Sequence, residues 1–111
     1  MTQLTEAVER NDLKEVKRLI KEGVDLDERD RGMQAPLHYA AHSDKYLKIA
    51  QLLIEHGAST KTHNRASETP LDLAEWSGSK EMRELFIRAY FINNSEARSI
   101  YYKILNSMYT E

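Results

Sequence analysis

The sequence predicts an all-α solenoid of about three helix-turn-helix repeats followed by one extra C-terminal helix. One pattern recurs about every 34 residues: residues 19–25 (LIKEGVD) return as 53–59 (LIEHGAS), and residues 35–40 (APLHYA) return as 69–74 (TPLDLA). A fixed period of this length is typical of stacked units that bury their apolar faces only against their neighbours. Within each unit the apolar residues follow a helical period, and no useful stretch alternates with period two.

The first unit is expected to contain two short helices, over 2–10 and 13–22. Asp12 is placed to cap the second helix, and Gly23 ends it where the chain must enter a left-handed turn. Each helix is too short to be stable alone, so packing must hold it. The apolar stripe of the second helix comprises Leu13, Val16, Leu19 and Ile20.

The next two units begin at prolines suited to the first helical turn. In the second unit we expect helices over 36–43, from Pro36, and over 46–56, before Gly57. In the third unit, Thr69 and Pro70 are the expected cap and first helical residue. The outer helix of this unit carries its apolar residues at helical spacing: Met82, Leu85, Phe86, Ala89 and Tyr90.

A different helix is predicted over 95–109, because apolar residues recur there at helical spacing outside the repeat pattern. We expect it to cap the apolar face of the third unit. Two alternatives remain open, namely docking to a partner and weak dimerisation of an otherwise monomeric protein. The apolar stripe comprises Ala97, Ile100, Tyr101, Ile104, Leu105 and Met108.

Composition favours one globular domain and argues against several functions. The 111 residues carry a net charge of -2, and no segment is strongly basic, so a nucleic-acid partner is not expected. The chain has no cysteine, no apolar run long enough to span a membrane, and no signal-like N-terminus. We therefore expect a cytoplasmic protein without membrane attachment.

The repeated segments resemble the ankyrin repeat, whose inner helix carries the pattern Thr-Pro-Leu-His-x-Ala-Ala. Residues 35–41 match it except for the threonine, and residues 69–74 match with Asp72 in place of histidine. The resemblance covers residues 4 to about 91. It divides the chain into an N-terminal capping repeat (1–31), a second repeat (32–65), a third repeat (66–92) and the C-terminal helix (95–109).

Three features depart from the family pattern. Ala35 replaces the capping threonine, and Met33 and Ser67 stand where the finger tip of the family usually has glycine. The segment between Ala41 and Ile49 is one residue longer than usual. The turn between the helices of repeat two is therefore expected to differ from the usual tight turn.

No group of residues indicates catalysis or a cofactor. The resemblance implies a structural role for His38, which would tie the inner helix to the finger backbone, and His42 and His63 are expected to be exposed. Residues 25–30 resemble a calcium loop only faintly, because Arg29 stands where an oxygen ligand belongs. We expect a protein that is not an enzyme and holds no metal.

The resemblance implies recognition of another protein through the concave face and the loop fingers, by an adaptor or scaffold. An alternative is an immunity- or antitoxin-type inhibitor that occludes the active site of a partner enzyme. Trp76 is expected either to anchor a partner on that face or to fold onto the C-terminal helix or into the core of the last repeat. The candidate partner-binding residues are Arg10, Arg31, Gln34, His42, Ser43, Arg65, Glu68, Trp76 and Ser77.

Overall fold

A computed structural model describes residues 2–77, 79–91 and 103, and within them the chain is helical without strands. The first repeat contains α1 (Gln3–Glu9) and α2 (Leu13–Lys21). The second contains α3 (Pro36–Ala40), a 3-10 turn η1 (Asp44–Tyr46) and α4 (Leu47–Glu55). The third contains α5 (Pro70–Ser77) and α6 (Lys80–Phe91). The predicted all-α repeat fold is confirmed.

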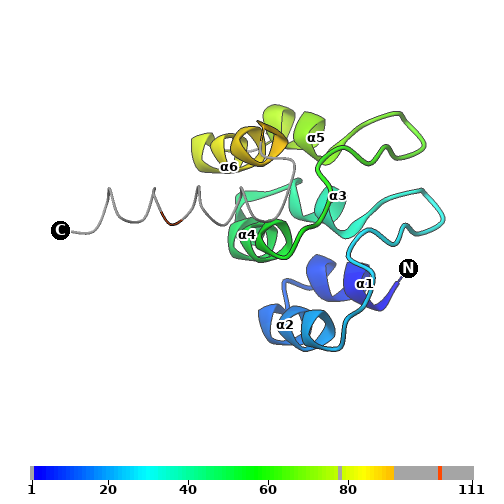
Figure 1. The fold of residues 1–111 in the computed structure, drawn as a ribbon. Helices are drawn as coiled ribbons and strands as arrows, with labels where there is room; N and C mark the ends of the chain where they lie inside the picture. Colours follow the sequence, from blue (N-terminus) through cyan, green and yellow to red (C-terminus); the bar gives the residue numbers. More distant parts are fainter. Residues whose placement is uncertain (1, 78, 92–102, 104–111) are drawn as a thin grey trace.

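The helices form two layers. The inner helices α1, α3 and α5 stack on one another, and the outer helices α2, α4 and α6 form the second layer (Figure 1). Two long loops, which we call finger one (residues 24–35) and finger two (residues 58–69), project side by side beyond the inner helices (Figure 1). By the concave face we mean the exposed side of α1, α3 and α5 together with these fingers.

One apolar core runs between the two layers through all three repeats. Small residues from the inner helices, such as Ala7, Ala40 and Ala74, let the helices approach closely. Larger residues from the outer helices fill the remaining space, and they include Val16, Leu19, Ile49, Leu53, Ile54, Met82 and Phe86. Since no repeat has a core of its own, stability depends on the contacts between repeats.

Helix ends follow the expected local chemistry. The Asp12 side chain accepts a hydrogen bond from the Glu15 N–H at 3.1 Å, which confirms it as the cap of α2. Gly23 (φ 84°) and Gly57 (φ 98°) both take the left-handed conformation that ends an outer helix. The expected stripe of α2 is only partly buried: Val16 and Leu19 lie in the core, whereas Leu13 and Ile20 are half-buried.

Our prediction for the inner helix of repeat two was too long. The helix ends at Ala40 instead of residue 43, because Ser43 is extended and caps η1 through a 3.4 Å hydrogen bond from the Lys45 N–H. The extra residue is absorbed by this 3-10 turn. Tyr46 then turns into the core, and its hydroxyl donates to the Glu9 carbonyl at 2.8 Å. The expected departure from a tight turn is thus confirmed.

The predicted helix over 95–109 lies outside the described residues apart from Lys103, which is helical and exposed. The roles expected for this helix, as a cap, a docking element or a dimer contact, therefore stay predictions. The backbone of Tyr90 continues α6.

Candidate functional site

Each finger is closed by the same set of hydrogen bonds around one side chain. In finger one, Asp30 Oδ1 accepts from the N–H groups of Gly32 (2.9 Å) and Gln34 (3.1 Å). In finger two, Asn64 Oδ1 accepts from Ala66 (3.0 Å) and Glu68 (2.9 Å). These two side chains fold each tip back on itself. Sequence reasoning missed them, although their spacing of one repeat was a usable signal.

The same turns force one residue per finger into the left-handed region. Met33 and Ser67 both have φ of 61°, where glycine is the favoured residue. A residue with a Cβ atom is strained there. The finger geometry expected of the family is therefore kept, and the turn hydrogen bonds must offset the strain.

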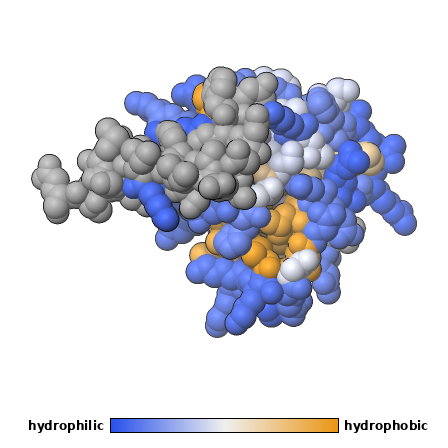
Figure 2. All heavy atoms as spheres, in the orientation of Figure 1, coloured by the Kyte–Doolittle hydropathy of each residue, from blue (hydrophilic) through white to orange (hydrophobic). Residues whose placement is uncertain are grey.

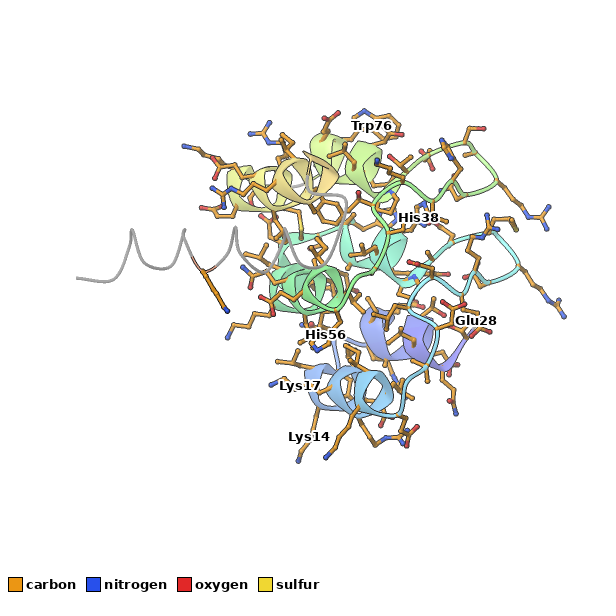
Figure 3. All side chains as sticks on the ribbon, viewed as in Figure 1. Lys14, Lys17, Glu28, His38, His56 and Trp76 are labelled. Atoms are coloured by element: carbon orange, nitrogen blue, oxygen red, sulfur yellow. The ribbon has the colours of Figure 1, made fainter. Side chains whose placement is uncertain are left out.

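His38 joins the two fingers, as the family resemblance implied (Figure 3). Its Nδ1 accepts from the Ala35 N–H at 2.9 Å, so Nε2 carries the proton and donates to the Glu68 carbonyl at 2.9 Å. Burial lowers the pKa of His38, although the hydrogen bond to Glu68 opposes that shift. The buried, neutral ring thus connects the first turn of α3 to finger two through two hydrogen bonds.

Asp30 also connects finger one to the inner helix, through the Tyr39 hydroxyl. Burial alone would raise the pKa of Asp30, but hydrogen bonds from Tyr39, Gln34 and Gly32 outweigh it and hold that pKa below its ordinary value. Burial, together with the bond to Asp30, raises the pKa of Tyr39 to about 12. Finger one is therefore fixed to α3 through the charged Asp30 carboxylate, whose two oxygens both accept hydrogen bonds.

The two finger tips are also bonded to each other. Arg65 Nε donates to the Arg31 carbonyl at 2.6 Å, and the Arg65 N–H donates to the Gly32 carbonyl at 3.2 Å. Arg31 and Arg65 are exposed and occupy equivalent tip positions. The two neighbouring finger tips, which project beyond the inner helices (Figure 1), thus each carry one exposed arginine.

The nine predicted partner-binding residues differ in how far they are exposed. Five are exposed on the concave face: Arg10, Arg31, His42, Arg65 and Trp76. Gln34, Ser43 and Glu68 are half-buried. Gln34 and Glu68 both accept hydrogen bonds from the Asn64 amide, at 3.2 and 2.9 Å. Ser43 caps η1, so all three side chains also stabilise the fold, and their contact with a partner stays a prediction. Ser77 ends α5, and its side chain lies outside the described residues.

Trp76 is the most exposed large apolar side chain described, with 68% of its surface accessible. It lies on α5 and points away from the repeats below it (Figure 3). Trp76 is therefore not buried in the core of the described repeats, and its contact with the helix predicted over 95–109 stays a prediction. Its role as a partner anchor stays a prediction.

The side of repeat three that faces away from repeat two is more polar than we expected. Glu75 is exposed at the position equivalent to the buried Ala41 of repeat two, and Ile87 is 40% exposed where Ile54 is buried. A hollow on this side is lined by Glu75, Lys80, Arg83, Glu84 and Ile87. A mostly charged surface is what a terminal repeat needs to face solvent.

Two further features of the described residues concern metal sites and membrane-spanning helices. Among residues 2–77, 79–91 and 103, no group of three or more histidine, aspartate and glutamate side chains is arranged to hold a metal ion. Within the same residues, no helix combines the length and apolar character needed to cross a bilayer.

Stacked helix pairs with paired, rigidly bonded fingers define a repeat protein built around an extended surface. The model of the family described as "Ankyrin repeats (3 copies)" matches residues 4–96. The chain belongs to the ankyrin repeat family.

Several curated proteins are similar to most of the chain. Human protein phosphatase 1 regulatory subunit 27 is 42% identical over 75% of the chain, which covers 53% of that protein. The rice potassium channel KOR1 is 42% identical over 74% of the chain, but only 9% of the channel is covered. The Arabidopsis potassium channel GORK is 34% identical over 74% of the chain and 10% of the channel. The chain thus spans about half, or far less, of the length of these relatives.

Proposed function

We propose that this chain is a non-enzymatic interaction module that binds one partner protein through its concave face and fingers. The observation that carries this proposal is Trp76, a large aromatic side chain that is 68% exposed on an inner helix. An exposed tryptophan loses little by leaving water and gains a large buried contact, so it is a common anchor at interfaces. The family is one whose repeats generally mediate protein–protein interaction, which supports the same conclusion.

The finger tips suggest what the partner carries. Arg31 and Arg65 are exposed, and the bonds between the tips keep the two residues in fixed relative positions. A planar guanidinium group pairs best with a carboxylate that accepts two parallel hydrogen bonds. The partner would therefore present acidic side chains to the finger tips and an apolar pocket to Trp76. Because the fingers are already ordered, little conformational entropy is lost on binding.

A second candidate is an inhibitor that occludes the active site of a partner enzyme. It is supported by the human relative, whose name describes a regulatory subunit of a phosphatase. The residues of the concave face are the same in both candidates, so only the partner separates them. Inhibition by the wild-type chain of the enzyme it captures would favour this candidate, and unchanged enzyme activity would favour the scaffold.

The test is capture of a partner from native lysate with the wild-type chain, Trp76→Ala and Ile87→Ala in parallel. Ile87 is the matched control, because among the described side chains of repeat three it is the other large apolar one that is exposed, but it lies on the outer helix α6. We expect Trp76→Ala to weaken binding by about 2 kcal/mol or more, roughly thirtyfold, and Ile87→Ala to have no such effect. Circular dichroism must show that both variants are folded. Equal capture by all three proteins would refute the assignment of Trp76.

The monomeric state and the cytoplasmic location are further parts of the proposal. Sedimentation of the purified chain over a range of concentrations tests the first. Microscopy of the chain in its own cells tests the second.

A further inference from the structure

The outer layer carries a second surface that the concave face does not explain. Figure 2 shows an apolar patch over α4 and between α4 and α2, with hydrophilic atoms at its sides and below it. Leu13 and Ile20 on α2 and Leu52 on α4 contact the core but stay half-buried. Two adjoining hollows, of about 200 and 310 Å³, share Lys17 and Leu52 in their lining. We call this surface, between α2 and α4, the outer groove.

The outer groove has an apolar floor because of the amphipathic pattern of α2. Val16 and Leu19 face the core, while Leu13 and Ile20 flank them and are left at the edge nearest α4. Leu52 meets them from α4, next to the buried Leu53. The outer groove thus has an apolar floor formed by Leu13, Ile20 and Leu52, and such a floor suits the apolar face of an amphipathic helix.

The sides of the outer groove are basic. Lys17 and Lys21 line it from α2, and Lys48 and His56 line it from α4. Glu55 is the one acidic residue in the lining. Figure 3 places Lys17 and His56 at facing edges of the two outer helices, with Lys14 further from α4.

The acidic residues of α2 do not neutralise these lysines. Glu15 and Glu22 both pair with Arg18, on the same helix. Among the described residues, Lys17, Lys21 and Lys48 form no ion pair. An apolar floor between unpaired lysines is complementary to an apolar stripe between carboxylates.

We propose that the outer groove binds an amphipathic helix of a partner protein whose apolar stripe is flanked by acidic residues. The apolar stripe, at positions i, i+3, i+4 and i+7, packs on Leu13, Ile20 and Leu52. Glutamates or aspartates beside the stripe face Lys17, Lys21 and Lys48. The groove lies in the outer helical layer, apart from Trp76 and the finger arginines, so both surfaces can be occupied at once. The chain would then join two partners, or two segments of one partner.

The test uses the full chain and synthetic peptides of about 15 residues, long enough for four helical turns. The first peptide has a leucine stripe flanked by glutamates. The second has the same stripe flanked by lysines, and in the third the leucines of the first are replaced by serines. Binding is measured by fluorescence anisotropy of labelled peptide. The binding site is mapped by amide chemical shifts of the nitrogen-15-labelled chain.

Two double variants with the same change of charge separate the outer groove from the concave face. Lys17→Glu with Lys48→Glu reverses the sides of the groove, and Arg10→Glu with Arg31→Glu reverses exposed charges on the concave face. All four side chains are exposed, so both proteins should fold. We expect the glutamate peptide to shift amides around Lys17, Ile20 and Leu52. The groove variant should lose about tenfold in affinity and the concave-face variant less than twofold.

Several results would overturn the proposal. Absence of amide shifts with the glutamate peptide would do so, as would equal affinity for the lysine-flanked or serine peptides. An equal loss in both double variants would show attraction by net charge only. The chain could instead self-associate without binding the peptide. Loss of that self-association in the Lys17→Glu with Lys48→Glu variant would assign the groove to a second copy. Binding to phosphatidylserine vesicles in place of the peptide would assign it to a lipid surface.

Discussion

Replacing Ser67 with glycine should make the protein more stable, although the change removes atoms. Ser67 has φ of 61°, and its exposed side chain makes no hydrogen bond with a described residue. A residue with a Cβ atom pays about 1–2 kcal/mol in this conformation, whereas glycine adopts it freely. The greater chain entropy of unfolded glycine offsets about 0.4–1 kcal/mol of that gain. We therefore expect Ser67→Gly to raise the free energy of unfolding by about 0.5–1 kcal/mol.

The assay is urea denaturation followed by circular dichroism, with Ser67→Ala as the control. Alanine keeps the Cβ atom and removes only the hydroxyl, so Ser67→Ala should change the free energy of unfolding by less than about 0.5 kcal/mol. The midpoint for Ser67→Gly should rise with an unchanged slope, because the surface exposed on unfolding is the same. A glycine variant no more stable than the alanine variant would show that the tip is not strained.

Three further predictions concern the interior. His38→Ala should lower the free energy of unfolding by about 2–4 kcal/mol in urea titrations, because it leaves the Ala35 N–H and the Glu68 carbonyl without their partner. Burial lowers the pKa of folded His38 below its ordinary value of 6.5, so its contribution is complete above about pH 6.5 and is lost as pH falls toward the folded-state pKa. Urea midpoints between pH 7.5 and 5 should fall for wild type and much less for His38→Ala, whereas equal slopes would contradict this assignment. Tyr46→Phe should cost about 0.5–1.5 kcal/mol, since it removes the hydroxyl that donates to the Glu9 carbonyl; an unchanged urea midpoint would show that this bond adds no stability.

The helical framework could be predicted because it depends on local signals. Gly23 and Gly57 end the outer helices, and Pro36 and Pro70 begin the inner ones, because each position restricts the backbone by itself. The repeat spacing then specified which helices are neighbours. The early end of α3 was missed because Ser43 acts through a cap on a 3-10 turn, for which a short sequence gives only a weak signal.

The candidate site was less predictable, because it depends on contacts between residues about 30 positions apart. Gln34, for example, accepts a hydrogen bond from the Asn64 amide 30 positions away, which its own local sequence does not indicate. Sequence alone gave two environments for Trp76, since exposure depends on how the third repeat meets its surroundings. The structure places this side chain in solvent. Asp30 and Asn64 make equivalent local bonds one repeat apart, a signal that we missed because the two residue types differ.

The most direct test of the central claim is amide hydrogen exchange of the full chain, alone and bound to the partner that it captures. The account predicts slower exchange on binding at the finger tips around Arg31 and Arg65 and at the end of α5 around Trp76. Protection confined to α2 and α4, with no change at the fingers or at α5, would contradict it.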